Sequence, residues 1–275
     1  MKQLSSLRTL SVSFIFIFTS LTSSGADRYR LSAGAAEAGA GYACITGRGF
    51  WASFQNQALL AGQNSFSTGI NYDNRFSMSQ LATRSAGAVI PAGRASLGVV
   101  YSTFGYSDFH RMFSGLACGL PLSDKLSAGI QIDYFAEKVP GDYLDLDLIT
   151  GELGIVYRFG ENSALGLHVF NPVPNSVRKT VLPTAIRAGA GTSLNSLLNA
   201  CAEAEMTSEN DLLLRMGFEY EAVRNFRIRA GFCTENTSFS FGAGYQVKFA
   251  AVDLAFSSHD KLGITSSVSI IFKFK

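Results

Sequence analysis

Charged residues in the C-terminal third of the chain are spaced so that they could pair across neighbouring strands. If the chain turns at residues 223–225, and again at residues 207–211, one register in each hairpin brings acids opposite bases. Opposite charges directly across two strands stabilise a sheet by roughly 0.2 to 1 kcal/mol each. Two interpretations stay open, a packed polar lumen and a selective ion pathway. The expected pairs are Glu203 with Arg215, Glu219 with Arg229, and Glu221 with Arg227.

Histidine is the side chain most often used as a general base, and the chain has three. His110 and His259 lie near expected loops, and His168 alternates toward the polar face of an expected strand. No Gly-x-Ser-x-Gly elbow accompanies them, and no ordered Ser or Asp partner lies nearby in the sequence. We therefore predict no catalytic residue and no enzyme activity. A site assembled in space, as in barrel lipases, is the alternative.

Cysteine and acidic residues give little sign of metal or disulfide chemistry. Cys44, Cys118, Cys201 and Cys233 are widely and irregularly spaced, with no C-x-x-C pair, so small residues on strands are favoured over disulfides. With so few histidines no zinc site is predicted, and no cofactor is expected. The carboxylates Asp142, Asp145 and Asp147 could bind calcium, but without calcium-loop spacing an exposed acidic loop is favoured.

The elements that would position these residues are strands. From Leu126 to Glu137 the even positions are apolar and the odd positions are mostly polar or small. Side chains of a strand alternate between the two faces of a sheet, so this pattern predicts one apolar and one polar face. The pattern returns in residues 214–221, 226–233, 239–247 and 264–274.

The same alternation fits a soluble sandwich, with the apolar face in a core, or a membrane barrel, with the apolar face in lipid. The segments run to about ten residues or more, longer than usual soluble strands. Tyr and Phe recur at segment ends, and Gly is frequent on the polar face. Because a sheet in lipid must close to satisfy its backbone, we predict an all-β fold, a transmembrane antiparallel β-barrel of about fourteen strands over residues 63–275. Its partner is then outer-membrane lipid. Short links, such as Lys248 with Phe249, alternate with longer loops, such as residues 172–183.

One expected strand shows a break in its alternation. Its leucines at 144, 146 and 148 are even, whereas Leu153, Ile155 and Tyr157 are odd. A bulge or bend near Ile149–Gly151 would return both sets to one face. We therefore predict an irregular strand here.

The N-terminus predicts export. Lys2 and Arg8 precede and flank an apolar run over Leu10–Phe18, and small residues follow up to Ala26. This order is typical of a signal peptide, which we assign to residues 1–26. A retained anchor is the alternative, but the apolar run is short of the roughly 20 residues that span a bilayer. The formal charge of +2 comes from this segment, so the remainder is balanced and no nucleic-acid partner is expected.

Residues 32–62 carry a resemblance to a known family. A stretch rich in small residues, with Gly39 and Gly41, precedes a run containing Trp51, Asn56 and Leu59. This order resembles the start of PorV/PorQ-family outer-membrane proteins, which are related to the fatty-acid transporter FadL. Their motif is an aromatic residue followed by an Asn-Pro-Ala-Leu-like run, and Gln57 stands here where that family usually has Pro.

The resemblance implies a barrel of fourteen strands with an N-terminal hatch, residues 27–62, folded inside it. It implies an accessory role in type IX secretion of Bacteroidota, with secretion subunits or cargo as partners and a bacterial outer-membrane location. Asn56 would then cap or pin backbone near the first strand. Gly39 and Gly41 would let the hatch pass close to the barrel wall.

An alternative function is a FadL-like channel for apolar solutes. Several apolar side chains alternate toward the otherwise polar inner face and could line a pocket above the hatch. Packing against the hatch is the other interpretation. These residues are Val100, Phe104, Phe113, Phe135 and Phe170.

Overall fold

A computed structural model describes residues 32–47, 49–107, 109–138, 146–173, 182–208 and 212–274. The predicted signal peptide, the first residues of the predicted hatch, and Asp142 and Asp145 lie outside the described residues. None of the described helices is both long and apolar enough to cross a bilayer.

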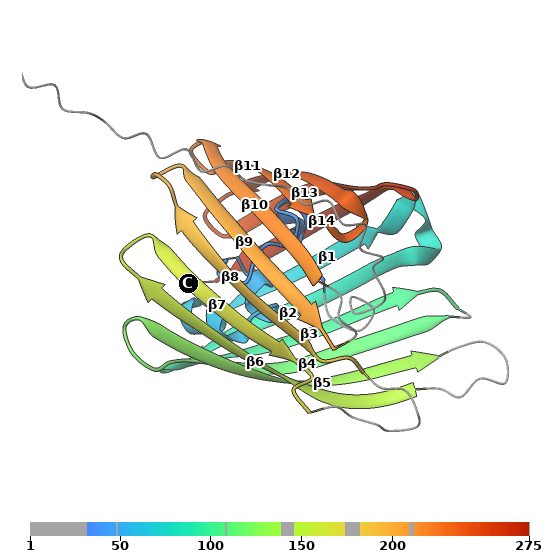
Figure 1. Ribbon diagram of the computed structural model, residues 1–275, viewed down its shortest axis with the longest axis horizontal. Helices are drawn as coiled ribbons and strands as arrows, with labels where there is room; N and C mark the ends of the chain where they lie inside the picture. The colour runs from blue at the N-terminus through green and yellow to red at the C-terminus, as the bar shows by residue number, and fades with distance from the viewer. Residues whose placement is uncertain are drawn as a thin grey trace, which may run out of the picture.

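Fourteen strands account for most of the described residues (Figure 1). Most of them carry the alternation of apolar and polar or small residues that keeps two faces distinct. They are β1 (Ser67–Asn74), β2 (Ala82–Ala92), β3 (Ala95–Gly105), β4 (His110–Pro121), β5 (Leu126–Lys138), β6 (Leu146–Phe159), β7 (Ser163–Phe170), β8 (Ala185–Ser193), β9 (Leu198–Thr207), β10 (Leu212–Val223), β11 (Phe226–Cys233), β12 (Ser238–Gln246), β13 (Ala250–His259) and β14 (Gly263–Lys273).

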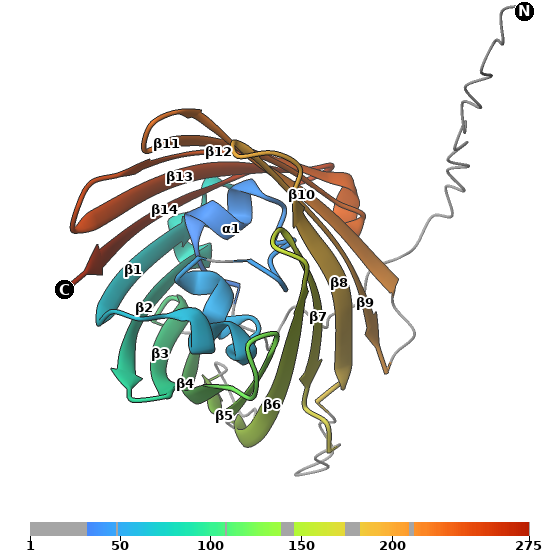
Figure 2. The same cartoon turned by 90° about the vertical axis from the view of Figure 1, so that its left-hand side faces the viewer.

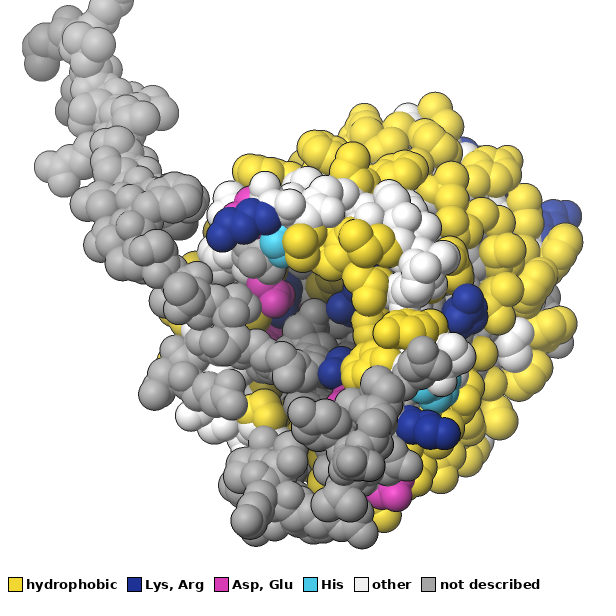
Figure 3. All heavy atoms as spheres, turned by 90° about the vertical axis from the view of Figure 1, so that its right-hand side faces the viewer, with side chains coloured by type: hydrophobic (Ala, Val, Ile, Leu, Met, Phe, Trp, Pro, Cys, Tyr) yellow, Lys and Arg dark blue, Asp and Glu magenta, His cyan; other side chains and the backbone are white. Residues whose placement is uncertain are grey.

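The strands form one closed barrel in which each pairs with its neighbours in sequence and β1 pairs with β14. All pairs are antiparallel, so the prediction of a fourteen-stranded antiparallel barrel is confirmed. The apolar faces of the strands point outward. Hydrophobic side chains cover much of the outer surface in Figure 3, and exposed examples from around the barrel are Ile70, Leu116, Ile132, Ile149, Phe241 and Phe256.

The two ends of the barrel differ in their connections. We call the end with the links 93–94, 122–125, 160–162, 194–197, 224–225 and 247–249 the short-turn end, and the other the long-loop end. The predicted short link at Lys248 and Phe249 is confirmed, because Tyr245 pairs with Val252 and the Val247 N–H donates to the Ala250 carbonyl at 2.7 Å.

Strand β6 differs from the prediction. It pairs with β5 in one unbroken register from Leu146 to Tyr157, so the predicted bulge near Ile149–Gly151 is wrong. Leu148 is buried and faces inward, whereas Ile149 is exposed on the outer face. The break in the sequence pattern arises because the lumen itself is apolar at the long-loop end of β6. Leu144 lies outside the described residues.

Residues 32–62, here called the inner segment, lie inside the ring of strands (Figure 2). They form α1 (Ala35–Gly39) and the 3-10 turns η2 (Trp51–Phe54) and η3 (Gln57–Gly62). Helix α1 packs on β11 to β14, and η3 packs on β3 to β6. Further 3-10 turns lie at η4 (Arg75–Ser77), η5 (Ser79–Leu81) and η7 (Glu235–Thr237), outside the inner segment.

Glycines on the inner face of the wall make room for the inner segment. A Cβ atom at Gly231 would lie 2.1 Å from the Gly41 nitrogen, and one at Gly242 would lie 3.0 Å from the Gly39 Cα. Real side chains do not approach so closely, so only glycine allows the two backbones to touch here. The wall glycines at which a Cβ atom would meet backbone or side-chain atoms of the inner segment are Gly69, Gly87, Gly98, Gly119, Gly129, Gly154, Gly166, Gly189, Gly191, Gly217, Gly231 and Gly242.

Candidate functional site

Four charged side chains on β8, β9 and β10 form a buried group that we call the four-charge cluster: Arg187, Glu203, Glu205 and Arg215. Arg187 contacts Glu203, and its Nε lies 3.6 Å from Glu205. Arg215 lies 2.6 Å from Glu205 and 3.3 Å from Glu203. Two cations and two anions balance, which is the condition for burying charges at tolerable free-energy cost.

The four-charge cluster also holds the backbone of the inner segment. Oε2 of Glu203 accepts the N–H groups of Cys44 at 3.2 Å and Ile45 at 3.1 Å. Arg187 donates to the carbonyls of Tyr42 at 3.3 Å and Gln55 at 3.5 Å. Two strand side chains thus satisfy four backbone groups of the inner segment that its own short helices leave unpaired.

The three expected charge pairs all occur in the predicted registers. β10 pairs Glu219 with Arg229, Glu221 with Arg227, and Arg215 with Glu203 on β9. Arg229 lies 2.7 Å from Glu219 and also 2.7 Å from Asp253 on β13. Arg227 lies 3.8 Å from Glu221, and both side chains are about a third exposed.

Sequence reasoning missed Arg187 and Glu205, which complete the cluster. The signal was present, since the hairpin of β8 and β9 pairs Arg187 directly with Glu205. The same test of opposite charges in one register, applied to the turn at Asn195 and Ser196, finds this pair. The contact with the inner segment has no comparable sequence signal, because it joins residues far apart in the chain.

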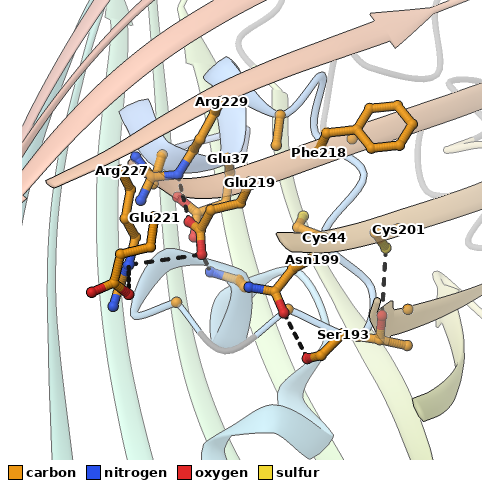
Figure 4. A pocket seen from close by; sticks show the side chains of 18 of the residues that line it. Glu37, Cys44, Ser193, Asn199, Cys201, Phe218, Glu219, Glu221, Arg227 and Arg229 are labelled. Carbon is orange, nitrogen blue, oxygen red and sulfur yellow. Dashed lines mark hydrogen bonds and ion pairs between the residues drawn. The ribbon is translucent and has the colours of Figure 1, made fainter. Parts of the chain in front are cut away.

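A recess of about 370 Å³ opens between the inner segment and the wall near the short-turn end. Figure 4 shows Glu219, Glu221, Arg227 and Arg229 gathered on one side of it, with Cys44 and Cys201 on another. Cys201 Sγ lies 3.4 Å from Thr46 Oγ1. None of the four cysteines, all of them among the described residues, is part of a disulfide, and burial raises the pKa of Cys44 far above its usual range.

Glu37 of α1 is a buried carboxyl beside this recess. Its Oε1 accepts the Ala52 N–H at 3.0 Å, whereas its Oε2 is buried without a hydrogen-bond partner. Both oxygens lie where a side chain at Gly34 or Gly49 would have to be. Burial raises the pKa of Glu37 to about 7, and Asp253 adds to the rise while Arg229 opposes it.

Three residues taken from the family motif, Trp51, Asn56 and Leu59, are buried inside the barrel. Asn56 caps η3 by accepting the Ala58 N–H at 3.2 Å, and it donates to the Ile45 carbonyl at 2.9 Å. Asn56 also reaches the Ile155 carbonyl of β6 at 3.5 Å. The backbone it pins therefore belongs to the inner segment and β6 rather than to the first strand. Trp51 and Leu59 are both buried.

Four of the five apolar residues predicted to line a lumen pocket come together. Val100, Phe113, Phe135 and Phe170 are buried in one apolar cluster with Trp51 and Leu148, which we call the lumen apolar cluster. The rings of Phe113 and Phe135 lie 4.9 Å apart. Phe104 lies outside this cluster, with the guanidinium groups of Arg75 and Arg111 at 5.5 and 5.8 Å from its ring.

The three histidines lie on strands β4, β7 and β13, which do not pair with one another. His110 begins β4 and is exposed. His259 ends β13, where its Nδ1 accepts the Lys261 N–H at 3.1 Å. His168 is buried on β7 and lies 2.9 Å from Glu152 of β6.

Around the long-loop end, charged side chains gather about a hollow (Figure 3).

Comparisons with known proteins identify the fold. No protein-family model and no curated protein matches the sequence. Among solved structures, the toluene transporter TodX of Pseudomonas putida is 11% identical, with a TM-score of 0.70 over 90% of this chain and 99% of its own. The toluene transporter TbuX of Ralstonia pickettii is 14% identical, with a TM-score of 0.68 over 88% and 98%. A FadL homologue of Pseudomonas aeruginosa is 12% identical, with a TM-score of 0.65 over 90% and 100%.

The chain thus has the fold of bacterial outer-membrane barrels of the FadL type, and its apolar outer face is that of a barrel surrounded by lipid. The predicted outer-membrane location agrees with this fold and with the apolar outer face. None of these matches is a PorV/PorQ-family protein, so the predicted resemblance is supported only at the level of the FadL-related barrel.

Proposed function

We propose that this outer-membrane barrel is a channel that admits small apolar molecules from its long-loop end. The observation that carries the proposal is the lumen apolar cluster. Inward residues of water-filled barrels are polar, yet Phe113, Phe135 and Phe170 face inward here and are buried against one another. Such a lining gives an apolar solute an apolar surface to bind, whereas it gives a polar, hydrated solute no hydrogen-bonding groups.

The likeness to two toluene transporters and a FadL homologue supports the same proposal at the level of fold. No observation supports the accessory role in type IX secretion, so we favour the channel hypothesis. We assign the chain no chemical step.

The test uses the only tryptophan of the chain as a reporter. Trp51 lies within the lumen apolar cluster and contacts Phe50 and Phe54. Toluene added to the purified full chain in detergent should change Trp51 emission in a saturable way. Phe135→Ser should abolish saturation, because it places a hydroxyl in the dry lining.

Phe241→Ser is the matched control, because Phe241 is 64% exposed on the outer face. It should leave saturation unchanged, and cells that express it should take up labelled toluene like wild type. Equal responses of the two variants would mean that toluene only partitions into the micelle, and the proposal would then fail.

A further inference from the structure

A second polar contact joins the inner segment to the wall, on the side opposite α1. It consists of Gln57 on η3, Gln131 and Asp133 on β5, and Glu152 on β6, which we call the acid–amide cluster. Every one of these side chains is at most 2% exposed. Gln131 Nε2 donates to Asp133 Oδ1 at 2.8 Å, and Gln57 Nε2 donates to Glu152 Oε2. The carboxyl groups of Asp133 and Glu152 lie close enough for the charge of one to act on the other.

The acid–amide cluster has more acceptors than donors. Gln57 Oε1, Gln131 Oε1 and Asp133 Oδ2 are buried without a hydrogen-bond partner. A buried acceptor left unsatisfied costs about 1 to 3 kcal/mol, and three in one connected group are unusual. The amide nitrogens are already used toward the carboxylates, so the free oxygens point to a missing positive or donating group.

The charges of the cluster point the same way. His168 lies against Glu152 at 2.9 Å and can supply one positive charge if it is protonated. In the described part of the chain, no Lys or Arg makes an ion pair with Asp133. Two neighbouring carboxylates buried from water cannot both stay ionised without a further cation between or beside them.

We propose that the acid–amide cluster binds one hard divalent cation, Ca²⁺ in the first place. The ligand atoms would be carboxylate oxygens of Asp133 and Glu152 and, once the two amide groups turn over so that their oxygens replace the nitrogens, the amide oxygens of Gln57 and Gln131. Ca²⁺ accepts carboxylate and amide oxygens in irregular arrangements, whereas Mg²⁺ demands a nearly ideal octahedron and keeps its waters. Among the described residues, no group of three or more His, Cys, Asp and Glu could hold a metal. This site instead draws half of its oxygens from amides.

Such an ion would tie the inner segment to the wall. Gln57 is the ligand from the inner segment, and β5 and β6 supply the rest. A ligand that binds only the docked arrangement stabilises it by mass action. The structure therefore links Ca²⁺ binding to the position of the inner segment, whatever solute the barrel carries. The rival occupant is a single proton shared by Asp133 and Glu152.

Titration calorimetry of the purified full chain in detergent, stripped with a chelator and then titrated with CaCl₂, tests the proposal directly. Wild type should bind one Ca²⁺ per chain and bind Mg²⁺ more weakly. Asp133→Asn should weaken Ca²⁺ binding at least about tenfold, since the number of charged ligands sets the affinity. Asp73→Asn removes another buried lumenal carboxyl, on β1, and should bind as wild type does.

A second variant keeps the test decisive if Asp133→Asn folds poorly. Gln57 is the first residue of η3 and follows an extended Asn56, a position that proline tolerates. Gln57→Pro removes one ligand oxygen and should also weaken binding. In wild type, Ca²⁺ should slow hydrogen exchange over residues 57–62. No binding by folded wild type, or equal weakening in Asp73→Asn, would overturn the proposal in favour of the shared proton or an unspecific charge effect.

Discussion

At the scale of single residues, ion pairs that look alike in the sequence lie in different surroundings. The side chains of Glu203 and Arg215 are 0% and 4% exposed. They belong to the four-charge cluster, whose charges balance and which hydrogen-bonds the backbone of the inner segment. Glu221 and Arg227 lie 3.8 Å apart and are about a third exposed. Loss of one partner from the buried group should cost about 3 to 5 kcal/mol, whereas the exposed pair contributes about 0 to 1 kcal/mol. Hairpin spacing predicts the partners, but the inner segment decides how deeply each pair is buried.

Glu37 gives a pH dependence that belongs to one side chain. Its pKa is about 7 in the docked inner segment, against an ordinary value of 4.5. Because the folded pKa is raised, docking is fully favourable below pH 4.5, weakens as pH rises from 4.5 to 7, and changes no further above that. The difference corresponds to roughly 3 kcal/mol. Hydrogen exchange at the Ala52 amide, which Glu37 accepts, should therefore quicken over this range.

Glu37→Gln is the control, because a neutral amide of the same shape does not titrate. Its Ala52 exchange, corrected for the intrinsic effect of pH, should stay flat where wild type quickens. Arg229 and Asp253 face Glu37 and remain in both proteins, so a pH effect shared by the two would assign the titration to those groups and contradict the prediction.

At the scale of elements, alternation predicts the strands closely, because one lipid face and one lumen face repeat around the barrel. The alternating stretch Leu126–Glu137 begins where β5 begins and ends one residue before β5 ends, at Lys138. The failure at β6 is informative. A sequence pattern that distinguishes only apolar from polar residues cannot separate Leu148, which faces an apolar lumen, from Ile149, which faces lipid.

Wall glycines and the inner segment form a matched pair of surfaces, which predicts a steric effect. Gly231→Ala on β11 would place its Cβ 2.1 Å from the Gly41 nitrogen and 2.3 Å from the Ala40 carbonyl carbon. Overpacking of this kind costs about 1 to 3 kcal/mol. The Gly41 and Tyr42 amides, both hydrogen-bonded within the inner segment, should exchange faster in this variant.

Gly151→Ala on β6 is the comparison, since its Cβ would meet only the Gln131 carbonyl at 3.4 Å. It should leave exchange of the inner segment unchanged. If both variants behaved like wild type, the inner segment would not be tightly packed against β11, and the close approach of Gly41 to Gly231 would not hold in solution.

At the scale of the whole molecule, the lumen is divided along its length. The lumen apolar cluster, to which Trp51 of the inner segment belongs, lies toward the long-loop end, and the recess beside the inner segment lies near the short-turn end. The sequence predicts the wall because its contacts are periodic and local. It does not predict the four-charge cluster's grip on residues 42–55 or the contact of Gln57 with Glu152, because these join distant segments without a repeating pattern.

The last prediction concerns the outer face of the barrel: the cost of a charged substitution there should depend on its depth in the bilayer. Ile132 lies at the middle of β5, is 63% exposed and pairs with Leu116. Ile132→Arg should destabilise the folded barrel in lipid vesicles by about 2 to 4 kcal/mol, because an arginine at the bilayer midplane loses its hydration. Phe159→Arg, at the short-turn end of β6, should cost only about 0 to 1 kcal/mol, since the side chain reaches the interface. Denaturant titration of both variants measures the difference. Equal costs at the two depths would mean that the apolar face of the strands does not meet lipid, and the membrane orientation argued from β5 and β6 would be wrong.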